Sequence, residues 1–120
     1  MKKILAVDDS ASMRQMVGFT LKTAGFDVTE ACDGSEALKA AKVSTFDLVI
    51  SDVNMPVMDG LTLIRNLRTL PTYKFTPLLM LTTESGGDKK QEGRSAGATG
   101  WIVKPFNPEQ LLATVRKVLG

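Results

Sequence analysis

The 120-residue sequence has no histidine and one cysteine, Cys32. Without histidine it has no Ser–His or Cys–His catalytic pair, no imidazole ligand for a metal and no histidine to phosphorylate. A lone cysteine excludes a disulfide within the chain and a zinc site built from cysteines. Catalytic or metal-binding groups must therefore come mainly from carboxylates, hydroxyls, amides and lysine. We expect Cys32 to be a buried or half-buried residue without a function.

Long apolar runs and blocks of like charge are also missing. No stretch approaches the ~20 apolar residues of a membrane span. The apolar segment after Lys2-Lys3 is too short for a signal peptide. The 15 basic and 13 acidic residues leave a net charge of +2, without the basic run of a nucleic-acid tail. We therefore expect a cytoplasmic protein that binds neither membranes nor nucleic acid.

Five short apolar runs recur along a chain whose length suits one domain, residues 1–120. The runs are 4–7, 26–31, 48–50, 78–81 and 101–103. Four of them are continuous rather than alternating, which is typical of strands covered on both faces in a parallel sheet. Helical patterns follow the runs, at 13–24, 33–41, 60–70, 88–96 and 107–119. The sequence therefore predicts five strand–helix units in an α/β domain.

Local signals mark several helix ends. Gly25 can end the first helix, and Asp33 with Glu36 three residues later resembles a capping box. Asn107-Pro108-Glu109-Gln110 places a cap, a proline and a glutamine at the same spacing. The pattern at 88–96 is the weakest, because it has little apolar content and a glycine inside that costs ~1 kcal/mol relative to alanine. We expect that helix to be short or mobile.

Polar side chains follow four of the five runs. They are Asp8-Asp9, Ser51-Asp52, Thr82-Thr83-Glu84 and Lys104-Pro105. In an open parallel sheet these positions lie along the carboxyl edge, where ligands bind. In one common strand order of such sheets, 2-1-3-4-5, the first and third strands are neighbours. Asp8, Asp9 and Asp52 would then converge.

Converging carboxylates need a compensating charge. They repel one another and raise each other's pKa values, and a divalent cation with a preference for oxygen ligands, such as Mg²⁺, relieves this repulsion. Lys104 adds a charge that can pair with a carboxylate or a phosphoryl oxygen, and Thr82 adds a hydroxyl donor. This set of groups suits phosphoryl transfer onto a carboxylate.

Taken together, the motifs resemble the receiver domain of bacterial response regulators. The stretches that carry the resemblance are Asp8-Asp9, Asp52, Asn54-Met55-Pro56-Val57-Met58-Asp59-Gly60, Thr82 and Lys104-Pro105-Phe106. The resemblance covers the whole chain and is strongest to stand-alone chemotaxis regulators. It implies a flavodoxin-like receiver fold, a doubly wound five-stranded parallel sheet in the order 2-1-3-4-5 with five helices.

The resemblance also implies roles for individual residues. Asp52 would be the phosphoacceptor. Asp8, Asp9, Asp52 and the backbone carbonyl of Asn54 would hold Mg²⁺. Thr82 would move toward the phosphoryl group, and Lys104 would pair with it.

Further positions carry tuning and switching roles in the family. The Lys104–Pro105 peptide bond is typically cis, which X–Pro bonds tolerate. The side chains of Asn54 and Glu84 lie where dephosphorylation is tuned. Trp101 stands where the family usually has a tyrosine or phenylalanine that turns inward when the threonine shifts, and tryptophan is bulkier.

The implied partners are other proteins. A sensor histidine kinase of the chemotaxis type would donate the phosphoryl group, and a phosphatase is a further partner. The protein, expected to be a monomer, would be no enzyme beyond assisting its own phosphorylation and dephosphorylation. Because no output domain follows Gly120, we expect output through phosphorylation-dependent protein binding. The flagellar motor switch, another chemosensory pathway and a phosphate sink stay open, and Lys90 and the glycines of 85–93 weaken the motor hypothesis.

Each residue alone also has an ordinary explanation. Asp8 and Asp9 could cap a helix, Asp52 could be a loop carboxylate, and Lys104 could be solvated; only their joint placement favours a site. A haloacid-dehalogenase-like phosphatase would need D-x-D, where Asp8 and Asp9 are adjacent. A flavodoxin-like or dinucleotide-binding module would need a glycine- or hydroxyl-rich phosphate loop, where these carboxylates would repel phosphate.

Overall fold

The computed structural model describes residues 1–82 and 87–119. Its strands are β1 (Lys3–Val7), β2 (Asp27–Ala31), β3 (Leu48–Asp52), β4 (Leu78–Thr82) and β5 (Gly100–Val103). Its helices are α1 (Ala11–Thr23), α2 (Gly34–Val43), α3 (Gly60–Arg68), the 3-10 turn η1 (Pro71–Tyr73), α4 (Gly87–Ala96) and α5 (Pro108–Leu119). Every one of the five apolar runs falls within or overlaps a strand, as predicted.

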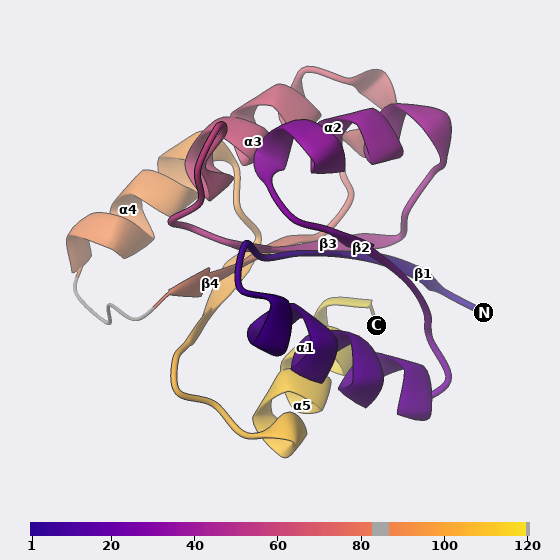
Figure 1. Ribbon diagram of the computed structural model, residues 1–120. Helices are drawn as coiled ribbons and strands as arrows, with labels where there is room; N and C mark the ends of the chain where they lie inside the picture. The colour runs from indigo at the N-terminus through magenta and orange to yellow at the C-terminus, as the bar shows by residue number, and fades with distance from the viewer. Residues whose placement is uncertain (83–86, 120) are drawn as a thin grey trace.

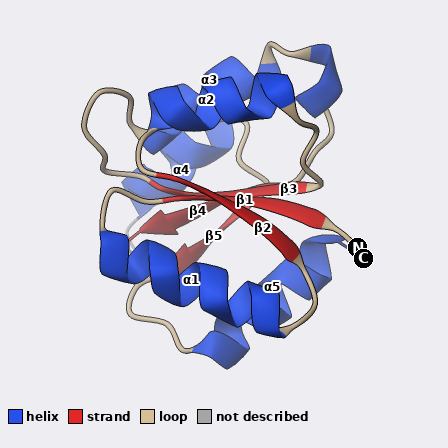
Figure 2. Ribbon diagram, turned by 45° about the vertical axis from the view of Figure 1, so that its right-hand side comes forward, coloured by secondary structure: helices blue, strands red, loops and turns tan. Residues whose placement is uncertain are grey.

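The strands form one parallel sheet in the order β2-β1-β3-β4-β5. Helices α1 and α5 cover one face, while α2, α3 and α4 cover the other (Figures 1 and 2). The predicted doubly wound α/β fold is therefore confirmed. Because β1 and β3 pair directly, with Val7 opposite Ser51, the residues that follow these two strands are brought side by side.

Burial explains why the central strands are continuous apolar runs. In a strand, successive side chains point to opposite faces, and here both faces are covered by helices. Leu5, Val49 and Met80 pack into the core beneath α2, α3 and α4. Ile50 and Leu79 pack into the second core, against α1 and α5. The edge strand β2 has only one fully buried residue, its last, which agrees with the weaker apolar pattern of its sequence.

The helix caps follow the sequence signals with one difference. At α5 the capping box is complete: Gln110 N–H donates to Asn107 Oδ1 at 2.8 Å, and Asn107 N–H donates to Gln110 Oε1 at 2.9 Å. At α2, Glu36 N–H donates to Asp33 Oδ1 at 2.8 Å, but the Glu36 carboxylate accepts from the preceding Cys32 N–H at 3.3 Å. The cap therefore extends one residue further back than a standard box.

Cys32 is exposed, so the expectation of a buried or half-buried cysteine is wrong. It lies just after the edge strand β2, where the chain leaves the sheet to enter α2. Its Sγ lies 3.2 Å from Glu36 Oε2, and this hydrogen bond raises the pKa of the Cys32 thiol. A raised pKa keeps the thiol protonated and unreactive at neutral pH.

Helix α4 has ten residues, as many as α2, so it is not the short helix that its sequence suggested. Its internal glycine has a packing reason. A Cβ at Gly93 would lie 2.7 Å from the Met80 sulfur, so a larger residue there would force the Met80 side chain to shift. Among the described residues, no helix combines the length and apolarity needed to cross a membrane.

Candidate active site

Three carboxylates meet at the carboxyl ends of β1 and β3. Asp8 follows β1 and Asp52 ends β3, next to each other across the sheet. One carboxylate oxygen from each of Asp8, Asp9 and Asp52 lies within 4.8 Å of the others. Asp8 and Asp52 are 2% and 9% exposed, whereas Asp9 is exposed. The structure therefore brings together the acidic residues that the sequence placed at one edge.

Asp8 is buried in an environment that disfavours its negative charge. Its Oδ1 accepts a hydrogen bond from Ser10 N–H at 2.9 Å, whereas its buried Oδ2 has no hydrogen-bond partner. Burial raises the pKa of the Asp8 carboxyl, and repulsion from Asp52 adds to this rise, against the lowering effects of Ser10 N–H and Lys104. A buried oxygen without a donor is costly, so this atom is suited to a cation.

Lys104 is the cation within the cluster. Its Nζ lies 3.1 Å from Asp52 Oδ1 and 3.6 Å from Asp8 Oδ2, and its side chain is 14% exposed. The backbone after β5 holds it in place, because Lys104 N–H donates to the Thr82 carbonyl oxygen at 2.7 Å. The Lys104–Pro105 peptide bond is cis. Lys104 thus links the ends of β4 and β5 to the two buried aspartates.

The remaining expected residues lie on the β4–β5 side. Thr82 is buried at the end of β4, opposite Val103 of β5. Trp101 is half-buried on β5, and the Arg94 guanidinium of α4 lies over its ring, 5.5 Å from the centroid. Glu84 lies outside the described residues. Thr82 therefore stands on β4, the neighbour of β3, and Trp101 stands on β5, one strand further out, in the half of the sheet that carries Lys104.

The loop between β3 and α3 is tied to the strand ends. Val53 N–H donates to the Leu81 carbonyl oxygen at 3.1 Å, and Gly60 N–H donates to the Val53 carbonyl oxygen at 2.9 Å. A Cβ at Gly60 would collide with the carbonyl oxygen of Asp52, so glycine allows α3 to begin directly against that residue. Asn54, in this loop, is exposed.

Val57 is the strained residue of that loop. Its φ is 68°, a left-handed conformation that is rare for a β-branched side chain. Its side chain is 83% exposed. Such conformations cost ~1–3 kcal/mol and cluster at functional sites. The strain lies five residues after Asp52, in the stretch that carries the most specific motif of the sequence.

One residue at the site was missed by the sequence reasoning. Arg14 of α1 donates from Nη1 to the backbone carbonyl oxygen of Asp8 at 2.8 Å. It also pairs with Glu30 of β2, Nε to Oε1, at 3.3 Å. Little in the sequence pointed to this contact, because the acceptor is a backbone atom and the six residues between Asp8 and Arg14 span a strand end and a helix start rather than one element.

The acidic residues fit a hard divalent cation. The donor set consists only of oxygen atoms, and the buried Asp8 Oδ2 is without a hydrogen bond. Mg²⁺ prefers such ligands and keeps several waters, which suits a cluster that is open on the Asp9 side. With Lys104 nearby, the arrangement can hold and neutralise a negatively charged oxygen group against Asp52.

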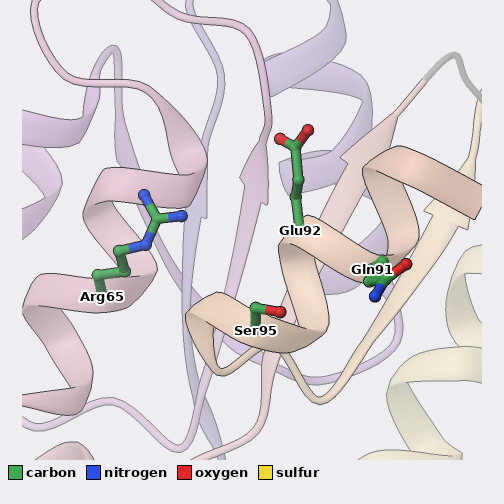
Figure 3. A pocket seen from close by; sticks show the side chains of 4 residues that line it. All are labelled: Arg65, Gln91, Glu92 and Ser95. Carbon is green, nitrogen blue, oxygen red and sulfur yellow. The ribbon is translucent and has the colours of Figure 1, made fainter.

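A separate surface pocket of about 310 Å³ lies between α3 and α4. Figure 3 shows its lining, Arg65 from α3 and Gln91, Glu92 and Ser95 from α4. None of the acidic-cluster residues lines it. The pocket is therefore no part of the arrangement around Asp52.

Comparison with known proteins gives one family. The sequence profile described as "Response regulator receiver domain" matches residues 4–116. The chain is 42% identical to chemotaxis protein CheY-3 of Vibrio cholerae over 117 residues, which cover 97% of this chain and 90% of that protein. It is 39% identical to chemotaxis protein CheY of Pseudomonas aeruginosa, over 97% and 94% of the two chains.

Solved structures agree with the sequence matches. Chemotaxis response regulator CheY4 of Vibrio cholerae superposes with a TM-score of 0.96 and 59% identity, over 98% of each chain. The receiver domain of sensor histidine kinase PA1611 from Pseudomonas aeruginosa superposes with a TM-score of 0.92 and 25% identity, over 99% of this chain and 98% of that one. That structure has a magnesium ion coordinated in its active-site cleft.

Proposed function

The chain belongs to the response regulator receiver family, to its chemotaxis type, and we propose that it accepts a phosphoryl group on Asp52 in a Mg²⁺-dependent reaction. One observation carries the proposal. The Asp52 carboxylate ends the central strand β3 with an ammonium 3.1 Å away and two further carboxylates within 4.8 Å. Asp8, Asp9, Asp52 and the Asn54 carbonyl would hold the ion, which would neutralise charge on the phosphoryl oxygens.

The proposed reaction is a displacement at phosphorus. A carboxylate oxygen of Asp52 forms the new P–O bond, and the P–N bond to the phosphohistidine of a kinase breaks. The leaving imidazole takes up a proton from water. Lys104 stabilises the negative charge of the phosphoryl oxygens, and the burial of Asp52 strengthens this interaction by keeping water away.

The proposed output is a rearrangement on the β4–β5 side. A phosphoryl group on Asp52 would compete with the present contacts of Lys104 and offer an acceptor to the Thr82 hydroxyl. Trp101 would report the change at the surface beside α4, where Arg94 now covers its ring. Asn54 and Glu84 would set how long the phosphoryl group persists. A chemotaxis-type histidine kinase as donor, a target protein as reader and a phosphatase complete the proposal.

Phosphorylation of Asp52 is directly testable. With Mg²⁺ and acetyl phosphate or phosphoramidate, the chain should gain one acid-stable, base-labile phosphate, and Asp52→Asn should abolish it, because an amide cannot displace the leaving group. Intact-mass spectrometry measures the gain. Asp59→Asn is a matched control, since Asp59 is an exposed carboxylate that only caps α3 and asparagine caps equally well. If the Asp52→Asn variant gained phosphate as fast as the unchanged chain, the assignment of Asp52 as the phosphoacceptor would be refuted.

The target is testable with the activated form. Beryllofluoride with Mg²⁺ mimics the phosphoryl group without turnover, so the treated chain should bind a purified target that the untreated chain leaves unbound. Purified motor switch protein is the first target to use. Binding only after activation would support motor control, and equal binding by the Asp52→Asn chain would contradict a phosphorylation-dependent output. Unchanged Trp101 emission on activation would contradict its role as the switching aromatic.

A further inference from the structure

Arg14 contacts the acidic cluster from the side of α1. Its Nη1 donates to the carbonyl oxygen of Asp8 at 2.8 Å, and its side chain is 21% exposed. The start of the same helix also contacts the Asp8 side chain, because Ser10 N–H donates to Oδ1 at 2.9 Å. Asp8 is therefore held at its carbonyl by Arg14 in the first turn of α1 and at its carboxylate by Ser10, the residue that caps this helix.

Arg14 is itself oriented by β2. Its Nε pairs with Glu30 Oε1 at 3.3 Å, and Lys22 Nζ lies 3.8 Å from the other oxygen of the same carboxylate. Between the two cations, a Cβ at Gly18 would come within 3.1 Å of Glu30 Oε2. Arg14, Gly18 and Lys22 are spaced four residues apart and lie on one face of α1. The glycine therefore leaves room for the Glu30 carboxylate against the helix.

We propose that Arg14 is a positioning residue for the cation site: its guanidinium, oriented by Glu30, fixes the Asp8 carbonyl and the turn that presents the Asp8 and Asp9 carboxylates. This inference rests on the proposed function, since it concerns the same Mg²⁺ site. A guanidinium can donate in two fixed directions at once, to a carbonyl and to a carboxylate. The single ammonium of a lysine cannot reproduce both contacts with this geometry.

The positive charge of Arg14 and its proposed positioning role have opposite effects on Mg²⁺ affinity, so an experiment can separate them. The positive charge of Arg14 beside the acidic cluster disfavours the binding of Mg²⁺. If Arg14 acted only through its charge, its removal would tighten Mg²⁺ binding. If Arg14 acts by holding the turn, its removal weakens Mg²⁺ binding, and so does replacement by lysine, which keeps the charge.

The test compares Mg²⁺ dissociation constants by isothermal titration calorimetry on the full chain. We expect Arg14→Lys and Arg14→Met to bind Mg²⁺ about tenfold more weakly than the unchanged chain, at the lower end for groups that orient metal ligands. Lys22→Met is the matched control. It removes a cation from the same Glu30 carboxylate but makes no contact with Asp8, so its affinity should stay within about twofold.

A second readout needs no metal. In the metal-free chain, the Ser10 amide should exchange its hydrogen faster in both Arg14 variants than in the Lys22 control, as measured by NMR, because the turn is held less firmly. Circular dichroism establishes that each variant is folded. A wild-type affinity in Arg14→Lys, or tighter binding in Arg14→Met, would overturn this inference alone. Absence of Mg²⁺ binding by the unchanged chain would overturn the proposed function, and the inference with it.

Discussion

Two half-buried cations lie at opposite ends of the strands, one with charged partners and the other with neutral partners. Lys104, at the carboxyl edge, contacts the carboxylates of Asp8 and Asp52. Arg68, at the end of α3, reaches the segments that enter β4 and β5. Its acceptors are the oxygen atoms of Tyr73, Lys74, Thr76, Gly97 and Thr99, at 2.7 to 3.4 Å. These acceptors are neutral, and burial lowers the pKa of the Arg68 guanidinium.

This difference means that the Lys104 contacts can be exchanged for others, whereas the Arg68 contacts are fixed. An ammonium on a flexible stem is a point charge that can turn from one acceptor to another, whereas a guanidinium fork is rigid. Lys104 faces two carboxylates that compete for it, so a new anionic group at Asp52 can redirect it. Arg68 holds several backbone carbonyl groups at once, and none of these acceptors carries a charge. Under the proposed function, the Lys104 contacts at the carboxyl edge are therefore the ones that change, whereas the Arg68 contacts at the amino edge stay in place.

The largest expected effect on phosphorylation within this comparison comes from Lys104→Met. We expect the rate of Asp52 phosphorylation by a small donor to fall roughly 10- to 100-fold, since a hydrogen bond to a charged group contributes about 1.5–3 kcal/mol. The measurement is intact-mass spectrometry over time. Lys74→Met is the control, because Lys74 is an exposed lysine near the opposite edge. An unchanged phosphorylation rate in Lys104→Met would show that the Lys104 contacts have no role in phosphorylation.

Arg68→Met should show the reverse pattern. It leaves several carbonyl groups without their donor, and we expect a loss of about 3 kcal/mol in the free energy of unfolding, at the high end for one unsatisfied site. The initial phosphorylation rate of the folded protein should stay within about twofold. Urea unfolding measures the first quantity. A stable variant with slow phosphorylation would show that the two edges are coupled rather than separate.

The smallest of the three effects concerns Asp8 and pH. Burial, reinforced by Asp52, raises the folded-state pKa of Asp8 above its ordinary 3.8. The folded chain thus holds this proton more tightly than the unfolded chain. The resulting stability is complete below pH 3.8 and is lost as the pH rises through the folded pKa. Without metal, Asp8→Asn should therefore raise the free energy of unfolding at pH 7, by less than Arg68→Met lowers it.

The same comparison can be made with Mg²⁺. At a hundredfold excess over its dissociation constant, a ligand that binds only the folded state adds about 2.7 kcal/mol. We expect this gain in the unchanged chain and a much smaller one in Asp8→Asn, by thermal unfolding at pH 7. An Asp8→Asn variant less stable than the unchanged chain in metal-free buffer would contradict the electrostatic strain at Asp8.

The sequence predicted the fold because the relevant signals are local. Continuous apolar runs mark strands that are covered on both faces, and Asn107 with Gln110 marks the start of α5 through contacts within four residues. The meeting of Asp8 and Asp52 followed from strand order, which the motifs supplied through the family resemblance. Their placement in the sheet is therefore as expected, whereas their roles remain proposals.

The sequence did not reveal features that depend on hydrogen bonds to backbone carbonyl groups or on the close packing of one element against another. Arg14 and Arg68 bind carbonyl oxygen atoms, which are present at every residue and leave no pattern in the sequence. Gly93 looked like a weak point in a helix, and only the position of Met80 shows why glycine packs well there. Cys32 was expected to be buried or half-buried, but it is exposed and its thiol bonds to the Glu36 carboxylate.

The close contact between the start of α3 and the Asp52 backbone has a practical consequence for building a fluorescent sensor from this chain. Because Gly60 lets the helix begin against the Asp52 carbonyl, α3 and the Asp52 backbone should move together. Under the proposed function, a single dye on α3 would therefore report little when Asp52 is phosphorylated. A donor dye on α3 and an acceptor dye on β5 would instead report any shift of the β4–β5 side relative to Asp52.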